Sequence, residues 1–84
     1  PEQVAPPDVE PERRLLAGEL LGTVRDAIES LTPKLRTTIE LRDLHGLSAE
    51  ETVELLGIDD RTQRVRLHRA RTQVREHVDL ALAV

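Results

Sequence analysis

This 84-residue sequence contains no cysteine, methionine, phenylalanine, tryptophan or tyrosine. Without cysteine the chain can form neither a disulfide nor a thiolate metal site, which fits a reducing compartment, and we expect the protein to be cytoplasmic. Without aromatic side chains the core must be aliphatic and thin, and unpaired bases have no platform on which to stack. No apolar run approaches the roughly 18 residues of a membrane-spanning helix, so we expect no membrane insertion.

The first residues also lack what a folded segment needs. There is no starting methionine, and we expect the sequence to be a piece of a longer protein. Residues 1–10 hold three of the five prolines and three acidic residues, with few apolar side chains. Such a stretch cannot offset the entropy lost on ordering its backbone. We therefore predict a flexible, acidic, proline-rich linker at 1–10 and one small domain at 11–84.

Basic residues are concentrated in one late segment, although the chain has a formal net charge of −4. Residues 60–84 carry six of the twelve Lys and Arg residues but only three of the sixteen Asp and Glu residues. All six are arginines that fall between Arg61 and Arg75, a stretch without any acidic residue. This segregation is the electrostatic footprint of an element that binds a polyanion, so the bulk charge conceals a candidate nucleic-acid-binding segment.

Apolar residues recur every three or four positions along most of the chain, which is the spacing of amphipathic helices. The expected buried stripes are Leu15, Leu16, Leu20, Leu21, Val24, Ala27 and Ile28 in the first helix, and Leu35, Ile39 and Leu44 in the second. Proline and glycine mark the boundaries, since Pro33 suits a helix start after Thr32, whereas Gly46 and Gly57 suit helix ends. No strand pattern competes with these signals. The sequence predicts an all-α, four-helix domain with a helix-turn-helix and without winged elements. The expected helices are residues 11–30, 33–44, 49–56 and 60–82.

Residues 48–59 predict two helices joined by a very short turn. Ser48 and Glu51 form a capping-box pattern, in which the serine hydroxyl accepts from a backbone amide and the glutamate reaches back. Gly57 suits the left-handed conformation that ends a helix, and Asp59 can cap the next one. A capped short helix, a tight turn and a basic helix make a helix-turn-helix, whose second helix enters the major groove of DNA.

One face of the basic helix is expected to contact DNA, because the stripe of Leu67, Ala70 and Val74 must face the core. An arginine fork can pair with both acceptors of guanine, and an apolar side chain can meet a thymine methyl. The predicted base-reading residues are Arg61, Arg64, Val65 and His68. Basic and hydroxyl side chains further round the helix should bind phosphates, which carry no sequence information. The predicted phosphate-contacting residues are Thr62, Arg66, Arg69, Arg71 and Arg75.

The run GLSAEETVELLGIDDRTQRVRLHRARTQVRE at residues 46–76 resembles region 4 of bacterial extracytoplasmic-function (ECF) sigma factors. The family pattern is similar to GLS-x-EEIAE-x-LGIS-x-GTVKSRLHRAR, and RLHRAR at 66–71 matches it closely. Upstream, LTPKLR at 31–36 looks like the preceding helix of the same region, and residues 1–10 look like the linker that joins regions 2 and 4. The resemblance spans about residues 11–78.

The resemblance implies a monomeric domain that reads the −35 promoter element as duplex DNA and docks on the flap of the RNA polymerase β subunit. It also implies an anti-sigma factor as a further partner. In this picture helices 33–44 and 49–56 offer an apolar cleft to the polymerase. The chain departs from the family pattern at Gln63, whose amide near the core should reach a backbone group or solvent, and at Val65, which should alter base preference.

Two other functions fit the sequence. A LuxR-type response-regulator effector domain is also a four-helix helix-turn-helix domain with a similar Leu-Thr-Pro and Gly-Leu-Ser start, although its recognition helix typically reads TVK-x-H. A protein-interaction module would use aliphatic grooves to bind an anti-sigma factor or the polymerase flap, with only weak DNA contact. A preference for a single −35-like site would favour the sigma-factor reading, whereas a palindrome bound by a dimer would favour the LuxR type.

Catalysis and metal binding find no support in the sequence. The serines, Ser30 and Ser48, fall at expected helix boundaries, where capping explains them, and there is no Gly-rich phosphate loop. His68 and His77 are nine positions apart and so lie on opposite sides of a helix. We therefore expect no enzyme activity, no cofactor and no metal site.

Overall fold

The computed structural model describes residues 11–83, with side chains from residue 17 onward, and the predicted linker at 1–10 lies outside this range. The described part of the chain is all-α, as the sequence predicts, and has no strand. A π-helical segment, η1, continues α2 directly. The elements in order are α1 (Pro11–Glu29), α2 (Pro33–Ile39), η1 (Glu40–Leu44), α3 (Ala49–Leu56) and α4 (Asp60–Leu82).

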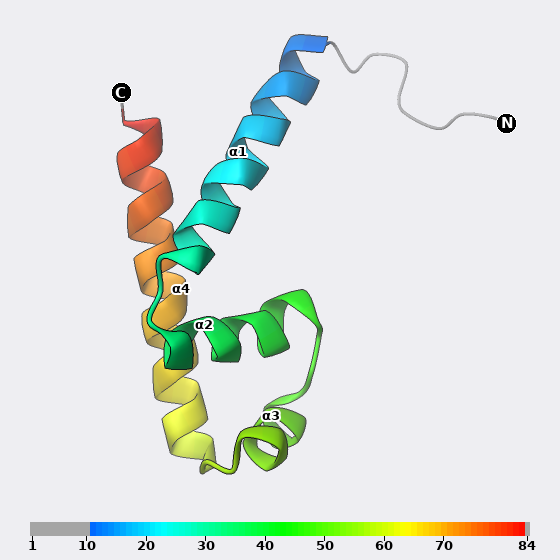
Figure 1. Cartoon of the computed structure of the whole chain (residues 1–84), viewed down its shortest axis with the longest axis vertical. Helices are drawn as coiled ribbons and strands as arrows, with labels where there is room; N and C mark the ends of the chain where they lie inside the picture. The colour runs from blue at the N-terminus through cyan, green and yellow to red at the C-terminus, as the bar shows by residue number, and fades with distance from the viewer. Residues whose placement is uncertain (1–10, 84) are drawn as a thin grey trace, which may run out of the picture.

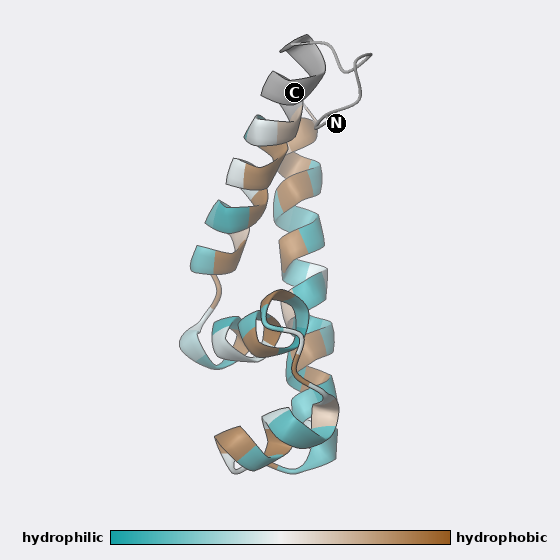
Figure 2. Ribbon diagram, turned by 90° about the vertical axis from the view of Figure 1, so that its right-hand side faces the viewer, coloured by the Kyte–Doolittle hydropathy of each residue, from teal (hydrophilic) through white to brown (hydrophobic). Residues whose placement is uncertain are grey.

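The long helix α4 is the spine of the domain (Figure 1). Helix α2 crosses the middle of α4, α1 packs along its C-terminal half, and α3 lies beside its first turns. Hydrophilic and hydrophobic residues alternate along α4, as expected of a helix with one buried face (Figure 2). Because three elements pack against α4 from one side, its opposite side is left open along the N-terminal half.

The turn between α3 and α4 is built from the caps that the sequence predicts. The Ser48 hydroxyl accepts from the Glu51 amide at 3.0 Å, and the Ser48 amide donates to the Glu51 carboxylate at 2.8 Å. Gly57 has a φ of 66°, in the left-handed region that glycine tolerates best. The Asp59 carboxylate then accepts from the Thr62 amide at 2.7 Å. These caps fix a three-residue connection, and the predicted helix-turn-helix is confirmed.

We expect Ser48→Ala to lower the free energy of unfolding by about 0.5–2 kcal/mol, because the first turn of α3 loses its side-chain acceptor. Urea unfolding followed by circular dichroism measures this change. Glu51→Gln is the matched control, since glutamine can still accept from the Ser48 amide and should cost less. Equal stability of Ser48→Ala and the wild type would contradict the assigned capping role.

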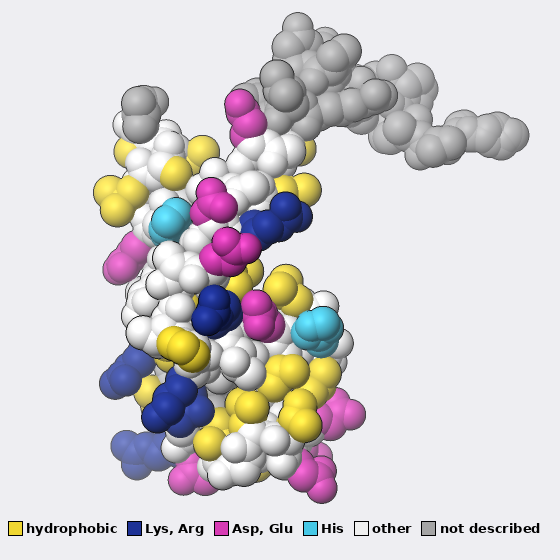
Figure 3. Space-filling model, viewed as in Figure 1, with side chains coloured by type: hydrophobic (Ala, Val, Ile, Leu, Met, Phe, Trp, Pro, Cys, Tyr) yellow, Lys and Arg dark blue, Asp and Glu magenta, His cyan; other side chains and the backbone are white. Residues whose placement is uncertain are grey.

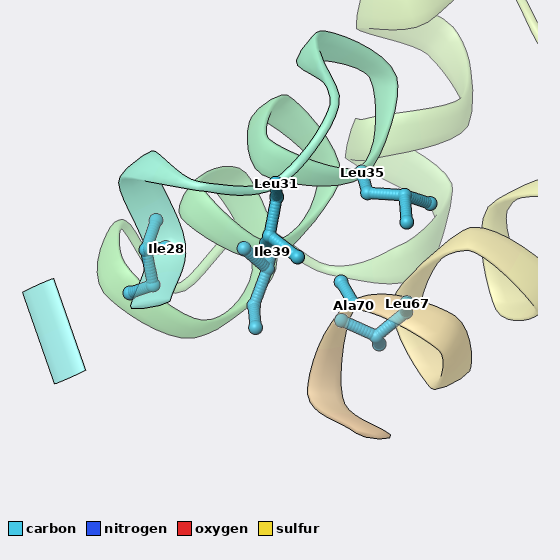
Figure 4. Close-up of a cluster of buried hydrophobic side chains, with 6 residues drawn as sticks. All are labelled: Ile28, Leu31, Leu35, Ile39, Leu67 and Ala70. Atoms are coloured by element: carbon cyan, nitrogen blue, oxygen red, sulfur yellow. The ribbon is translucent and has the colours of Figure 1, made fainter. Parts of the chain in front are cut away.

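The core is a small aliphatic cluster where α1, α2 and α4 meet (Figure 4). Leu67 and Ala70 are its α4 members, with exposed fractions of 6% and 0%, and Val24 and Val74 pack against its edge. This confirms the predicted stripe on α4. The buried residues of the cluster are Ile28, Leu31, Leu35, Ile39, Leu67 and Ala70.

The apolar stripe of α1 is buried only in part, which corrects the sequence expectation. Ala27 and Ile28 are buried, but Leu20 and Leu21 are 41% and 64% exposed. The reason is visible in the fold, because α1 and α4 diverge above their crossing and leave the middle of α1 without a packing partner (Figure 1). The expected contributions of Leu15 and Leu16 concern side chains outside the described residues.

The end of the second helix also differs from the α-helix predicted to residue 44. In η1 the His45 amide donates to the Glu40 carbonyl five residues back, at 2.9 Å, so the last turn is wider than an α-turn. Leu44, expected to extend the buried stripe, is 61% exposed. Two neighbouring residues of the same segment, Arg42 and Asp43, form side-chain hydrogen bonds to residues of α4 instead. The π-helical turn thus becomes a polar anchor for α4.

Candidate nucleic-acid interface

The four predicted base-reading residues lie together on the exposed side of α4. Arg61, Arg64, Val65 and His68 are all exposed, and with Arg69 they line a single shallow depression. The depression is opposite Leu67 and Ala70, which hold the other side of the helix against the core. Lys and Arg side chains gather along this lower part of α4 in the space-filling view (Figure 3). The structure therefore brings all four predicted residues together on a cationic surface.

One of these arginines already has an acidic neighbour. Arg64 Nε lies 3.2 Å from Asp60 Oδ2, one helical turn earlier, and both side chains are more than half exposed. Exposed pairs of this kind contribute little to stability. This contact uses Nε of the Arg64 guanidinium and not its Nη edge, which leaves that edge for an external acceptor.

The five predicted phosphate-contacting residues do not share one environment. Arg69 and Arg75 are exposed, and Thr62 is half-buried. Arg66 is half-buried and lines a separate hollow with Lys34, Thr37 and Leu56, between α2 and the end of α3. Arg66 thus places a second positive charge beside Lys34, outside the depression that the candidate base-reading residues line.

Arg71 differs from the other cations because it is paired inside the domain. Its Nε donates to Asp43 Oδ2 at 2.9 Å, and its Nη2 donates to Asp43 Oδ1 at 2.6 Å. This two-pronged contact joins η1 to the middle of α4. The hydrogen bonds from Arg71 hold the pKa of Asp43 below its ordinary value of 3.8, against a smaller opposing effect of burial. A phosphate would have to compete with Asp43 for this guanidinium.

The Asp43–Arg71 pair predicts a pH-dependent contribution to stability. Since the pKa of Asp43 is depressed in the folded state, the contribution is fully present above the unfolded value near 3.8 and is lost as the pH falls through the folded pKa. We expect Asp43→Asn to lower the free energy of unfolding by about 0.2–1 kcal/mol at pH 7, as for other exposed pairs. Urea unfolding at pH 7 and at pH 2.5 measures this difference, which should shrink at the lower pH. A constant difference at both pH values would exclude the ion pair as its cause.

Gln63 lies deeper than the sequence suggests. We expected its amide to reach a backbone group or solvent, but its exposed fraction is 0%. Its Oε1 accepts from Arg42 Nη1, while its Nε2 lies 3.4 Å from the Asp60 carbonyl and 3.2 Å from Asp60 Oδ1. The backbone contact is therefore present and the solvent contact is not. Arg42, whose Nε also donates to the Leu47 carbonyl at 3.0 Å, is a partner that sequence reasoning missed.

Two apolar hollows lie away from the depression on α4. One is lined by Leu21, Val24, Ile28 and Leu44 between α1 and η1, with Arg25, Glu29 and Glu40 also on its wall. The other lies on α3, where Leu47 and Leu55 meet Glu51 and Glu54. The sequence predicts an apolar cleft on helices 33–44 and 49–56. The structure adds α1 as one wall of the first hollow.

Within residues 11–83, no helix is both long and apolar enough to cross a membrane. Among the side chains that the structure describes, no group of three or more His, Asp or Glu residues is arranged to hold a metal ion.

The fold and this surface define a helix-turn-helix domain whose second helix presents a cationic, solvent-exposed face. Comparison with protein families identifies the family of this domain. The family model described as sigma-70, region 4 matches residues 21–74, and the chain belongs to this family. The matched range contains the core cluster, α3, the turn before α4 and every candidate base-reading residue, and it ends within α4.

Full-length relatives carry sigma-factor names. The chain is 40% identical over 76 residues to the RNA polymerase sigma-H factor of Pseudomonas aeruginosa, covering 89% of this chain and 37% of the relative. It is 38% identical over 68 residues to the ECF RNA polymerase sigma-E factor of Haemophilus influenzae, covering 81% and 36%. It is 35% identical over 77 residues to the ECF RNA polymerase sigma factor SigE of Mycolicibacterium smegmatis, covering 92% and 30%. The chain thus spans about a third of the length of these relatives.

Proposed function

We propose that this chain is the −35 recognition domain of an alternative sigma factor of the ECF type. In this role it binds promoter duplex DNA in the major groove and docks on RNA polymerase to direct transcription initiation. The observation that carries the proposal is the grouping of Arg61, Arg64, Val65 and His68 in one exposed depression on the second helix of a helix-turn-helix. The family match supports the same role.

Base recognition falls to four of the five residues that line this depression, and the fifth, Arg69, is assigned to phosphate. Arg61 and Arg64 can present a guanidinium edge to the O6 and N7 acceptors of guanine, and Val65 can pack against a thymine methyl. His68, one helical turn beyond Arg64, extends the surface along the groove. The valine makes this reading surface partly apolar, which favours a T-containing step next to a guanine.

Phosphate binding falls to Thr62, Arg66, Arg69 and Arg75. Arg69 also lines the depression, whereas the other three lie outside it. Each arginine phosphate contact releases counterions and steepens the salt dependence of binding. Arg71 is a weaker candidate because Asp43 occupies two donors of its guanidinium. It reaches a phosphate only if that pair opens.

Docking on the polymerase is assigned to the apolar side of the domain, away from α4. The hollow between α1 and η1 exposes Leu21 and Leu44, whose side chains would be buried by a partner helix. The partners in the proposal are the RNA polymerase β flap and an anti-sigma factor, and the domain acts as a monomer in the cytoplasm without catalytic activity. A pure protein-interaction module is the second candidate, and this hollow is the observation that favours it.

Binding to duplex DNA tests the proposal. Fluorescence anisotropy of the isolated domain is measured on a −35-type duplex with a GGAAC-like core and on a scrambled duplex, over roughly 50–200 mM salt. We expect preference for the −35-type duplex, one domain per site, and a steep salt dependence. Binding of a dimer to a palindrome would favour a LuxR-type effector. Binding to neither duplex would favour the interaction module.

A further inference from the structure

A chain of polar contacts runs from the turn before α3 to the base-reading surface. It begins at the Leu47 carbonyl, which accepts from Arg42 Nε at 3.0 Å. Arg42 Nη1 donates to Gln63 Oε1. Gln63 Nε2 lies 3.2 Å from Asp60 Oδ1, and the other carboxylate oxygen, Asp60 Oδ2, lies 3.2 Å from Arg64 Nε. We call Arg42, Gln63, Asp60 and Arg64 the polar relay.

The donors and acceptors of these groups determine which atom of Gln63 faces each of its two neighbours. A guanidinium has only donors, so the amide atom of Gln63 that faces Arg42 must be the oxygen. The amide nitrogen must then face Asp60, whose carboxylate has only acceptors when ionised. Because Gln63 is fully buried, water cannot replace either partner of its amide, and loss of a partner would leave a buried polar group unsatisfied. The orientation of the Asp60 carboxylate is therefore set from inside the domain.

The relay has a consequence for Arg64. With Oδ1 engaged by Gln63, the Oδ2 atom of Asp60 is directed along the helix surface to Arg64 Nε. Holding the guanidinium through Nε leaves the two Nη groups free as an end-on fork. That fork matches the paired acceptors on the major-groove edge of guanine. A flexible arginine would lose rotamer entropy on binding, and partial preorganisation reduces this cost.

We propose that Gln63 is a positioning residue for base recognition, which acts through Asp60 to orient Arg64 on the reading surface. The effect of Gln63 on base recognition rests on the proposed DNA-binding function, whereas the contacts of the polar relay do not. It explains why a buried amide stands on the edge of an aliphatic core. It also gives Asp60 a task beyond its place in the first turn of α4.

A single-base scan of the −35-type duplex tests the relay. The base pair read by Arg64 is the one at which Arg64→Ala loses discrimination. We expect Gln63→Leu and Asp60→Asn to lose discrimination at that same base pair, by about two- to fivefold, since an exposed ion pair orients a side chain only modestly. In the Arg64→Ala background neither substitution should cause further loss there. Asp60→Asn keeps an acceptor for Gln63, so this variant still tests the relay if Gln63→Leu does not fold.

Asp79→Asn is the matched control, because it removes one exposed negative charge from the far end of α4. This variant should change the affinity for all duplexes by the same factor, and it should leave discrimination unchanged at every base pair. Equal loss at every base pair in Gln63→Leu, or further loss in the Arg64→Ala background, would overturn the proposal. Unchanged discrimination in both relay variants would do so as well.

A second measurement is independent of DNA. The Nε–H group of Arg64 is followed by nitrogen relaxation in the free domain, and we expect restricted motion that increases in Gln63→Leu and Asp60→Asn but not in Asp79→Asn. Equal mobility in all four proteins would overturn the relay. A wild-type domain with a restricted Arg64 but no base preference would instead remove the proposed function and leave the relay as an intramolecular contact only.

Discussion

Leu67→Ala is expected to lower the free energy of unfolding by about 2–5 kcal/mol. Leu67 is the larger of the two α4 side chains in the core cluster, with an exposed fraction of only 6%. Removing it leaves a cavity at the crossing of α2 and α4, where the thin aliphatic core has no aromatic side chain to fill the space. A loss of this size approaches the whole stability of a small domain, about 3–5 kcal/mol.

Urea unfolding followed by circular dichroism measures this loss. Leu80→Ala is the matched control, because it removes the same atoms from the same helix at a position that is 75% exposed. The control should change stability by less than about 0.5 kcal/mol, as surface substitutions usually do. Similar losses for the two variants would mean that the assignment of buried and exposed faces on α4 is wrong.

Arg64→Ala is expected to reduce the preference for the −35-type duplex over a scrambled one by about 5- to 150-fold. This range corresponds to the 1–3 kcal/mol of discrimination that a bidentate arginine–guanine contact supplies. The variant should fold normally, because the Arg64 side chain is 70% exposed. Anisotropy titrations on the two duplexes at one salt concentration give the ratio directly.

Arg75→Ala is the matched control for Arg64→Ala, as an exposed arginine on the same helix outside the depression. It should weaken binding to both duplexes alike and lower the magnitude of the salt slope by about 0.9. If Arg64→Ala instead weakens both duplexes equally, Arg64 binds phosphate and does not read a base. The proposed reading surface would then reduce to Arg61, Val65 and His68.

Local signals in the sequence were sufficient for the helical framework. Ser48, Glu51, Gly57 and Asp59 act within a few residues of themselves, so their spacing alone predicts the caps and the turn, and the structure confirms them. The side of α4 that faces the core follows in the same way from the spacing of Leu67 and Ala70. The candidate base-reading residues then follow by exclusion from the buried side.

Tertiary geometry explains what the sequence does not predict. Leu21 and Leu44 fit an apolar periodicity, yet each is more than 60% exposed, since α1 diverges from α4 and the π-helical turn ends the buried stripe. Periodicity shows which side of a helix is apolar but not how far a neighbouring helix covers it. The structure is needed to see where packing stops.

The sequence also did not predict the side-chain contacts between residues that are far apart along the chain. Arg71 and Asp43 are 28 positions apart, and Arg42 and Gln63 are 21 apart. Neither spacing carries a helical signal, because each contact depends on where η1 lies against α4. From the sequence, Arg71 was therefore predicted to contact phosphate, and Gln63 was predicted to be an amide near the core that reaches a backbone group or solvent. The fold makes the first an ion pair and the second the centre of the polar relay.

We propose above all that the exposed side of α4 binds the promoter duplex. Nuclear magnetic resonance of the nitrogen-15-labelled domain, titrated with the −35-type duplex, tests it most directly through the amide and arginine side-chain signals. We expect the largest shifts at Arg61, Arg64, Val65 and His68, with little change at Leu21 and Leu44 in the hollow between α1 and η1. Shifts confined to that hollow, or spread evenly over the domain, would contradict the account.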